Sequence, residues 1–301
     1  MIAIRRIVPL ALALAFWAPA ALARQALVNR RVAIAPDASI RVFNLVGSIR
    51  VTGWDKDSLA VIGKLSPGAG KLFYFGAGGR GAKLGVEAPD GAEPDGPTNL
   101  QVYVPAKAKL WIKGATADIV VNGFEGSLDL YSVSGAITVN GSPAQVYAES
   151  MDGNVEVNGN AKWVRAKTAS GSLTVTGGGE DVGATTVSGT MTLREAHVVR
   201  GRFESVTGDI YFEGDVDRGA SLTFESHSGA IDLRLPSNVS ADFDVNEFQG
   251  KIVNELTNAL PQPVRERGGQ QLSFTAGQGG ADVTIRNFKG SVLLGRWLPK
   301  K

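Results

Sequence analysis

A small residue recurs at regular intervals along the middle of this chain, and this recurrence restricts the possible folds more than any other feature. Its members are Ala117, Gly135, Gly153, Gly171, Gly189, Gly208, Gly229 and Gly250. The spacing is 18 residues from position 117 to position 189 and slightly longer afterwards. A repeat of this length is typical of proteins in which one supersecondary unit stacks on the next.

Each repeat carries the alternation of a half-buried strand. Ile137 and Val139, two and four residues after a repeat glycine, flank the polar Thr138, and most other repeats follow the same pattern. Such alternation indicates a strand with one buried face. A second strand precedes each glycine, with inward pairs such as Val146 and Ala148. Each repeat therefore predicts two short strands and two turns.

A unit this small cannot bury its apolar face alone, so successive copies are expected to stack in parallel. We therefore predict an all-β, single-domain parallel β-solenoid, similar to a β-helix, with coils of about 18–21 residues. The repeat glycine is expected at a corner where the backbone needs positive φ. Coils rising about 4.8 Å each would make the regular part, residues 115–256, a rod on the order of 35–40 Å long.

Less regular β segments flank the repeats and are expected to begin and end the stack. Residues 39–51 would begin it, and residues 281–294 would end it. Proline, glycine and polar residues between Glu87 and Thr98 predict a loop, and those from Thr257 to Gln271 predict a second loop or a cap. Irregular segments of this kind could cover the unpaired strand edges at the ends of a solenoid.

The recurrent units from Ser134 to Ile252, the phrase Val102-Tyr103-Val104-Pro105 and the closing segment Asp282 to Leu294 resemble the bacterial "putative adhesin" family of β-strand-repeat domains of unknown function. The resemblance covers nearly the whole chain after residue 23. It implies a solenoid fold and a location outside the cytoplasm. It brings no catalytic residues with it.

Residues 1–23 have the three parts of a secretory signal peptide. Arg5 and Arg6 precede an apolar run that ends at Trp17, and Ala21-Leu22-Ala23 forms a small-x-small cleavage site. A membrane anchor is the alternative, but Pro9 interrupts the run, which is shorter than the roughly 20 residues that span a bilayer. We expect cleavage before Arg24, a solenoid domain over residues 24–301, and no integral membrane span after cleavage. The protein would then be exported, and periplasmic, surface-bound or secreted.

Composition excludes several classes of function. The chain has no cysteine, so disulfides, thiolate metal sites and a cysteine nucleophile are excluded. It has 31 Lys and Arg against 29 Asp and Glu, and two of those arginines belong to the signal. A mature charge near zero does not favour a nucleic-acid partner.

Two motifs suggest sites but have simpler interpretations. Gly76 to Gly81 reads G-x-G-x-x-G, yet the following residues do not favour the helix that a dinucleotide site needs, so we predict a β-turn or hairpin. His197 and His227 are the only histidines and lie too far apart in the repeat to share a metal site. We expect His227 to be partly buried and paired with a neighbouring hydroxyl; a nucleophile and base formed with Ser226 or Ser228 is disfavoured, because neighbours in a strand point to opposite faces.

A row of hydroxyl residues is the sharpest polar feature of the repeat. We expect these side chains to bond the turn backbone rather than to present a polar strip to a ligand. The acidic residues of the outward positions are scattered, which disfavours the carboxylate pair of a glycan-active enzyme. The hydroxyl row is Ser132, Ser150, Thr168, Thr186, Ser205 and Ser226, and the acidic residues include Asp152, Glu156, Asp209, Glu213 and Asp232.

The sequence therefore predicts no catalytic, cofactor or metal site. The leading hypothesis is a non-enzymatic, exported, adhesin-like scaffold of the cell envelope that binds an envelope protein or a glycan. The alternatives are an envelope structural or stress-sensing protein that self-associates by strand addition, and a polysaccharide-active β-helix enzyme. Trp54, Trp163 and Trp297 would stack on sugars if exposed, although packing is the commoner role of such residues.

Overall fold

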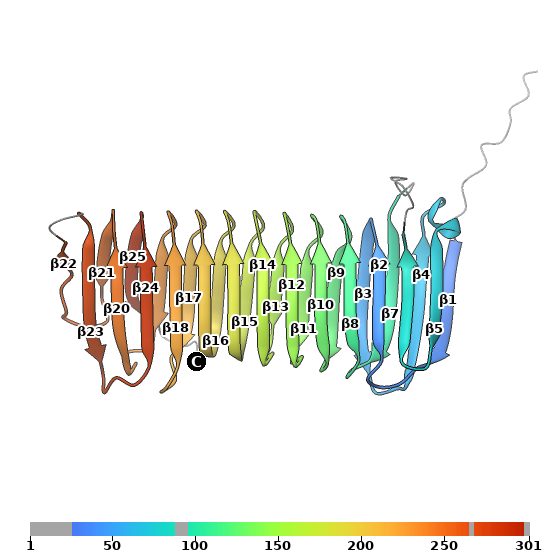
Figure 1. Cartoon of the computed structure of the whole chain (residues 1–301), viewed down its shortest axis with the longest axis horizontal. Coiled ribbons are helices and arrows are strands. Elements are labelled where there is room, and N and C mark those ends of the chain that lie inside the picture. The colour runs from blue at the N-terminus through green and yellow to red at the C-terminus, as the bar shows by residue number, and fades with distance from the viewer. Residues whose placement is uncertain (1–25, 88–95, 265–267, 298–301) are drawn as a thin grey trace, which may run out of the picture.

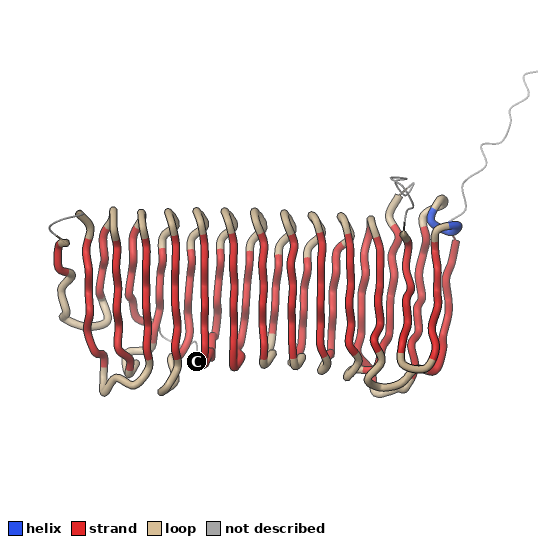
Figure 2. Tube along the Cα trace, viewed as in Figure 1, coloured by secondary structure: helices blue, strands red, loops and turns tan. Residues whose placement is uncertain are grey.

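The computed structural model describes residues 26–87, 96–264 and 268–297. The chain winds into a straight stack of coils, each contributing one strand to either side (Figure 1). Strands and short connections make up nearly all of it, and the one helical segment among the described residues is the 3-10 helix η1, Ala69–Lys71 (Figure 2). The prediction of an all-β parallel solenoid is confirmed. The predicted signal peptide, residues 1–23, lies outside the described residues.

Two sheets face each other across the core, and we call them sheet 1 and sheet 2. Sheet 1 holds the strand that precedes the corner glycine of each coil, and sheet 2 holds the strand that follows it. Two long strands, β15 (Leu173–Thr186) and β16 (Met191–Ser205), run through both sheets. Neighbouring coils pair in parallel and mostly in register, as Val146 with Val164 and Ala148 with Ala166 illustrate.

The other strands of sheet 1, in spatial order, are β5 (Phe73–Gly78), β6 (Gly81–Val86), β2 (Ser39–Asn44), β8 (Lys109–Gly114), β10 (Ser127–Ser132), β12 (Gln145–Ser150), β14 (Trp163–Thr168), β18 (Ser221–Ser226), β24 (Asp282–Asn287), β20 (Ala241–Glu247), β23 (Gln270–Ala276) and β22 (Gln262–Pro263). Strands β15 and β16 lie between β14 and β18.

The other strands of sheet 2, in the same direction, are β1 (Ala26–Ala33), β4 (Ser58–Leu65), β7 (Thr98–Pro105), β3 (Gly47–Trp54), β9 (Asp118–Phe124), β11 (Ile137–Gly141), β13 (Val155–Asn158), β17 (Ile210–Asp215), β19 (Ile231–Leu235), β25 (Ser291–Arg296) and β21 (Lys251–Asn254). Strands β15 and β16 lie between β13 and β17.

The core is a set of apolar ladders between the two sheets. Alternate residues of almost every strand are fully buried, as the sequence pattern predicts. Three larger side chains, Phe203, Phe212 and Phe224, pack against one another near the C-terminal part, with ring centroids 4.9–6.1 Å apart. Parallel stacking thus places like side chains over like side chains, so each coil buries the apolar face of the next.

The repeat glycine does lie at a corner, but our reason for it was wrong. Its φ is not positive at Gly135, Gly153 or Gly171. Instead, the corners approach so closely that a Cβ on Gly153 would lie 2.1 Å from the carbonyl oxygen of Gly135. No side chain fits that gap. Positive φ occurs at the opposite corner, for example at Gly141 and Gly159.

The order of the coils differs from the order of the sequence at the N-terminal end. We expected residues 39–51 to begin the stack. The coil formed by β2 and β3 instead lies between the β6–β7 coil and the β8–β9 coil, and it pairs in parallel with both (Figure 1). From β1, which lies beyond this coil, the chain enters the stack for one coil and returns outward through β4, β5 and β6 before the regular repeats begin.

The C-terminal end is built the same way. The last coil, β24 with β25, lies between the β18–β19 coil and the β20–β21 coil. Gly250 therefore stacks on Gly290 and not on Gly229, the preceding glycine of the sequence repeat. The predicted regular part, residues 115–256, is interrupted in space after β19. The β2–β3 coil and the β24–β25 coil, which are the first and last parallel coils in the sequence, therefore each pair with a neighbouring coil on both sides.

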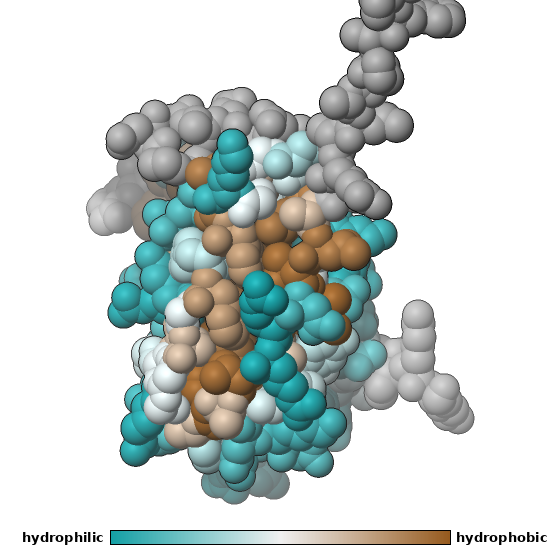
Figure 3. All heavy atoms as spheres, turned by 90° about the vertical axis from the view of Figure 1, so that its right-hand side faces the viewer, coloured by the Kyte–Doolittle hydropathy of each residue, from teal (hydrophilic) through white to brown (hydrophobic). Residues whose placement is uncertain are grey.

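The two ends of the stack are finished differently. At the N-terminal end, apolar surface is visible between the edges of the sheets (Figure 3), and Leu27 of β1 is 77% exposed. Exposed Arg30 and Arg31 on the same edge strand oppose pairing with another chain. At the C-terminal end, Gln270 accepts a hydrogen bond from the N–H of Ile252 at 2.6 Å. The segment predicted as a loop or cap thus covers part of that edge.

The inserted last coil makes a testable difference. Deleting residues 282–301 should expose residues 241–254 to exchange as well, because the coil that pairs β20 and β21 to the rest of the stack is removed. Hydrogen exchange measured by mass spectrometry would detect this. Deleting residues 298–301 alone is the control and should change nothing. Unaltered protection of 241–254 in the longer deletion would contradict the observed coil order.

Candidate functional site

Aromatic side chains line up along the outer face of sheet 1 in its N-terminal half. They come from β5, β2, β8, β10 and β12, with β6 between the first two of these strands, and the centroids of successive rings are 6.3, 5.0, 5.9 and 5.4 Å apart. All five side chains are half-buried. We call this set the aromatic ladder, and its members are Tyr74, Phe43, Trp111, Tyr131 and Tyr147.

The ladder follows from strand register. Trp111 and Asp129 are directly opposite in adjacent strands, as are Tyr131 and Glu149. The rings from Phe43 to Tyr147 therefore lean diagonally toward the ring of the next strand, a distance that aromatic side chains reach easily. Tyr74 and Phe43 instead both lie opposite Gly85 of β6 and meet across that glycine. The outward positions alternate with buried ones, so the rings are fixed to a rigid sheet rather than to loops.

Cationic groups lie over several of these rings. The Nζ of Lys83 is 4.8 Å from the centroid of Phe43 and 4.9 Å from that of Tyr74. The Nζ of Lys167 is 5.5 Å from the centroid of Tyr147. Next in the sheet, the guanidinium of Arg165 lies 4.2 Å from the centroid of Trp163. These are cation–π distances, in which the negative face of each ring attracts the charge.

Charge divides the outer face of sheet 1 into two halves. On β6, β2, β8, β10, β12 and β14 the outward cations exceed the outward acids, whereas on β15, β16, β18, β24 and β20 the acids exceed the cations. The outward cations of the first half are Arg41, Lys83, Lys109, Lys113, Arg165 and Lys167, against Asp129 and Glu149. Those of the second half are Arg200, Arg202 and Arg286, against Asp181, Glu204, Glu225, Asp282, Asp242 and Asp244.

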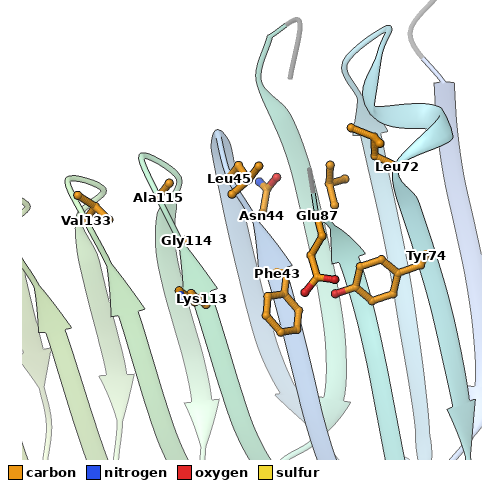
Figure 4. Close-up of a pocket in the computed structure, with 11 residues that line it drawn as sticks. Phe43, Asn44, Leu45, Leu72, Tyr74, Glu87, Lys113, Gly114, Ala115 and Val133 are labelled. Carbon is orange, nitrogen blue, oxygen red and sulfur yellow. The ribbon is translucent and has the colours of Figure 1, made fainter. Parts of the chain in front are cut away.

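Two grooves border the ladder. The larger, of about 660 Å³, lies where Tyr74, Phe43 and Lys113 approach the corner residue Leu45, and Glu87 reaches toward the Tyr74 hydroxyl inside it (Figure 4). The second, of about 480 Å³, lies beside Trp111 and includes Phe43, Arg41 and Lys109. Both offer apolar ring surface next to a cation, which is an arrangement suited to binding.

The tyrosines of the ladder resist ionisation. Burial, followed by the nearby Glu87 carboxylate, raises the pKa of Tyr74. Burial and the charges of Asp129 and Glu149 raise the pKa of Tyr131. A hydrogen bond that Tyr147 donates to Glu149, together with burial, raises the pKa of Tyr147 to about 12. The phenols therefore stay neutral over the whole physiological pH range.

Glu149→Gln should lower the pKa of Tyr147 toward its ordinary value of 10.0, because the charged acceptor that stabilises the phenol is removed. Spectrophotometric titration of tyrosine between pH 9 and pH 13 would measure this. In the unchanged protein, the hydrogen bond of neutral Tyr147 to Glu149 should contribute to the free energy of unfolding below pH 10. That contribution should be lost as the pH rises toward 12 and the phenol ionises. Glu213→Gln, on the other sheet, is the control; an equal shift there would argue against the assignment.

The hydroxyl row bonds the turn backbone, as predicted, at every member except Thr186, whose buried hydroxyl has no hydrogen-bond partner among the described residues. Its members are buried at the corner. Thr168 donates to the carbonyl of Gly153 and accepts from the N–H of Gly171, both at 3.1 Å. Ser150 makes the equivalent bonds to Gly135 and Gly153 one coil earlier. At the same positions of the inserted coils, Asn44 donates to Thr98 and Asn287 donates to Gly229.

Thr168→Val should lower the free energy of unfolding by about 1–3 kcal/mol, because a buried carbonyl and a buried N–H lose their partner. Urea unfolding followed by circular dichroism would measure the loss. Thr168→Ser keeps the hydroxyl and is the matched control, with a smaller expected effect. A Val variant as stable as the parent would refute the structural role.

The two histidines lie on opposite corners and are not brought together. Our expectation that His227 is partly buried and paired with a neighbouring hydroxyl was wrong. It is exposed, and its ring stacks on Phe288 with centroids 4.9 Å apart and planes 5° apart. Phe288 belongs to the inserted last coil, so sequence order alone could not place it there. His197 lies 3.8 Å from Asp215 at the other corner.

The remaining candidate residues form no reactive cluster. The G-x-G-x-x-G segment forms the turn of the β5–β6 hairpin, as predicted. The acidic residues are spread over three coils; Asp209, for example, accepts from the N–H of Ala230, and Asp232 pairs with Arg234 at 2.7 Å. No group of three His, Asp or Glu side chains suited to a metal occurs in the described ranges. No helix within those ranges is long and apolar enough to span a membrane.

Of the tryptophans considered as sugar-stacking residues, one is exposed and another is packed. Trp163 is 45% exposed and carries Arg165 on its ring. Trp54 stacks on Tyr103 at 5.3 Å, which is a packing role. The sequence analysis missed the aromatic ladder. A search of the outward strand positions for aromatic residues would have found Tyr131 and Tyr147 in successive repeats.

The geometry defines a class: a parallel β-solenoid with patterned outer faces and no assembled reactive centre among the described residues. Residues 95–294 match the family described as Toastrack DUF4097, and the chain belongs to that family. This confirms the expected resemblance to "putative adhesin" domains of unknown function. No curated protein matches the chain.

Solved structures with low sequence identity resemble it over most of its length. A "putative adhesin" from Parabacteroides distasonis is 15% identical, covers 89% of this chain and 96% of its own, and has a TM-score of 0.44. A "putative lipid binding protein" from the same organism is 12% identical, with the same coverage and a TM-score of 0.47. A "putative adhesin" from Bacteroides fragilis is 12% identical, again with the same coverage, and has a TM-score of 0.43.

Proposed function

We propose that this protein is an exported, non-enzymatic, adhesin-like scaffold of the cell envelope. The observation that carries the proposal is the outer face of sheet 1, where a ladder of aromatic rings with adjoining cations and two grooves is held on a rigid surface. Such a face can bind a long partner through many weak contacts without changing it chemically. Solenoids offer extended surfaces of this type.

Export is part of the proposal and is supported by the signal-peptide pattern of residues 1–23. The mature domain would begin at Arg24 and remain periplasmic or reach the cell surface. Names of structurally similar proteins, adhesin and lipid-binding protein, agree with a binding role and include no enzyme. The partner would be a glycan or a protein of the envelope, and the near-zero mature charge gives no support for nucleic acid.

Incubating the purified mature chain with peptidoglycan and a panel of bacterial polysaccharides tests the proposal. We expect the chain to be retained and no soluble fragments to be released, since the outward acidic groups are spread along the stack and neither groove beside the aromatic ladder brings two of them to a common substrate. Retention is measured by co-sedimentation and fragments by mass spectrometry of the supernatant. Fragment release that depends on an acidic residue such as Asp209 would overturn the non-enzymatic proposal. Concentration-dependent growth in sedimentation, with no retention, would favour the self-associating alternative.

A further inference from the structure

We propose that the aromatic ladder binds an acidic polysaccharide, with the glycan chain lying along the axis of the solenoid. This inference rests on the proposed function and names its ligand class. Pyranose rings would stack on the aromatic rings, and carboxylates on the sugars would pair with the adjoining cations.

Stacking is the first requirement, and the ladder meets it. The rings follow one another along the sheet at separations of 5.0–6.3 Å, the first two across the glycine of the intervening strand β6, so neighbouring sugar units would meet neighbouring rings. The negative face of an aromatic ring attracts the C–H groups on the apolar face of a pyranose. Because all five rings belong to β strands, the line is pre-organised and little entropy is lost on binding.

The excess of positive charge around the aromatic ladder favours a polysaccharide that carries negative charge. On the outer face of strands β6 to β14, six cations outnumber two acids. Arg41, Lys109 and Lys113 form no ion pair with any described residue. By contrast, Arg202 in the acidic half pairs with Glu204 and Glu225. Unpaired cations beside the half-buried rings attract carboxylates that a sugar chain presents along its length.

The grooves favour a glycan over a second copy of this chain. A two-fold pairing of two sheet-1 faces would also set the basic half against the acidic half. However, a flat sheet would bridge the grooves beside Trp111 and Tyr74, of about 480 and 660 Å³, and leave them unfilled. Lost contacts at such voids weaken an interface. A chain of rings with projecting substituents can enter them.

The test measures affinity of the mature protein for polygalacturonate and alginate, each compared with its methyl-esterified form. Esterification removes the charge and keeps the sugar rings. We expect the acidic forms to bind at least about tenfold more tightly than the esters. About 0.5 M NaCl should remove most of that difference, because salt screens exposed charges.

Two pairs of variants separate stacking from charge. Trp111→Ala with Tyr131→Ala removes ring surface, and Lys109→Gln with Lys113→Gln removes exposed charge without touching the core. Each pair should weaken binding about tenfold or more. Tyr211→Ala and the pair Arg194→Gln with Lys251→Gln make matched changes on exposed positions of sheet 2 and should have no effect. Circular dichroism of every variant confirms folding, and the lysine pair preserves the test if the aromatic pair unfolds.

Three outcomes would overturn the inference. These are no binding of either acidic polymer, equal binding of the esters, or equal weakening by the sheet-2 variants. A dimer that the Lys109 and Lys113 changes dissociate, seen by sedimentation without polymer binding, would assign the face to a second copy instead. If envelope material still retains the protein while all ladder variants behave normally, only this inference fails. Loss of all retention would refute the proposed function itself.

Discussion

Close backbone contact at one corner of most coils, where glycine is required, is the constraint on which this structure depends. The carbonyl of one repeat glycine lies where the Cβ of the next would be, so any side chain there would force the coils apart. Glycine lets the coils stack at the spacing of hydrogen-bonded strands, and buried hydroxyls such as that of Thr168 bond the same turn. The corner therefore keeps the register on which both the core and the surface depend.

Because successive coils pair in register, equivalent residues of neighbouring coils lie in continuous rows. On the inside this produces continuous apolar rows, and each coil buries its neighbour. On the outside it produces the aromatic ladder at one end of sheet 1 and an excess of acidic side chains at the other. A binding surface of this kind needs no loops and no cleft. It is made by the same outward strand positions that hold polar side chains in an ordinary repeat, which is why a purely structural periodicity can carry a function.

The inserted end coils explain how a stack without disulfides is secured. Coils at the ends of a solenoid have only one neighbour and tend to open first. Here both the first and last parallel coils have neighbours on each side, and antiparallel strands form the outermost layers. Separating either inserted coil from the stack therefore breaks its pairing with two neighbouring coils. Asn44 and Asn287 occupy the hydroxyl row in these two coils, where their longer side chains bond the backbone of the adjoining coil.

The sequence by itself determined the strands, their buried faces, the corner glycines and the parallel stacking, because all of these repeat at short range. It also located the hydroxyl row and the dispersed acids correctly. The tertiary structure decided the order of the coils at both ends, since nothing in a repeat specifies which copy a terminal coil will pair with. That order brings Phe43 to Trp111 and His227 to Phe288. The aromatic ladder is complete only in space, because three of its five rings, Phe43, Tyr74 and Trp111, come from strands outside the regular repeat of residues 115–256.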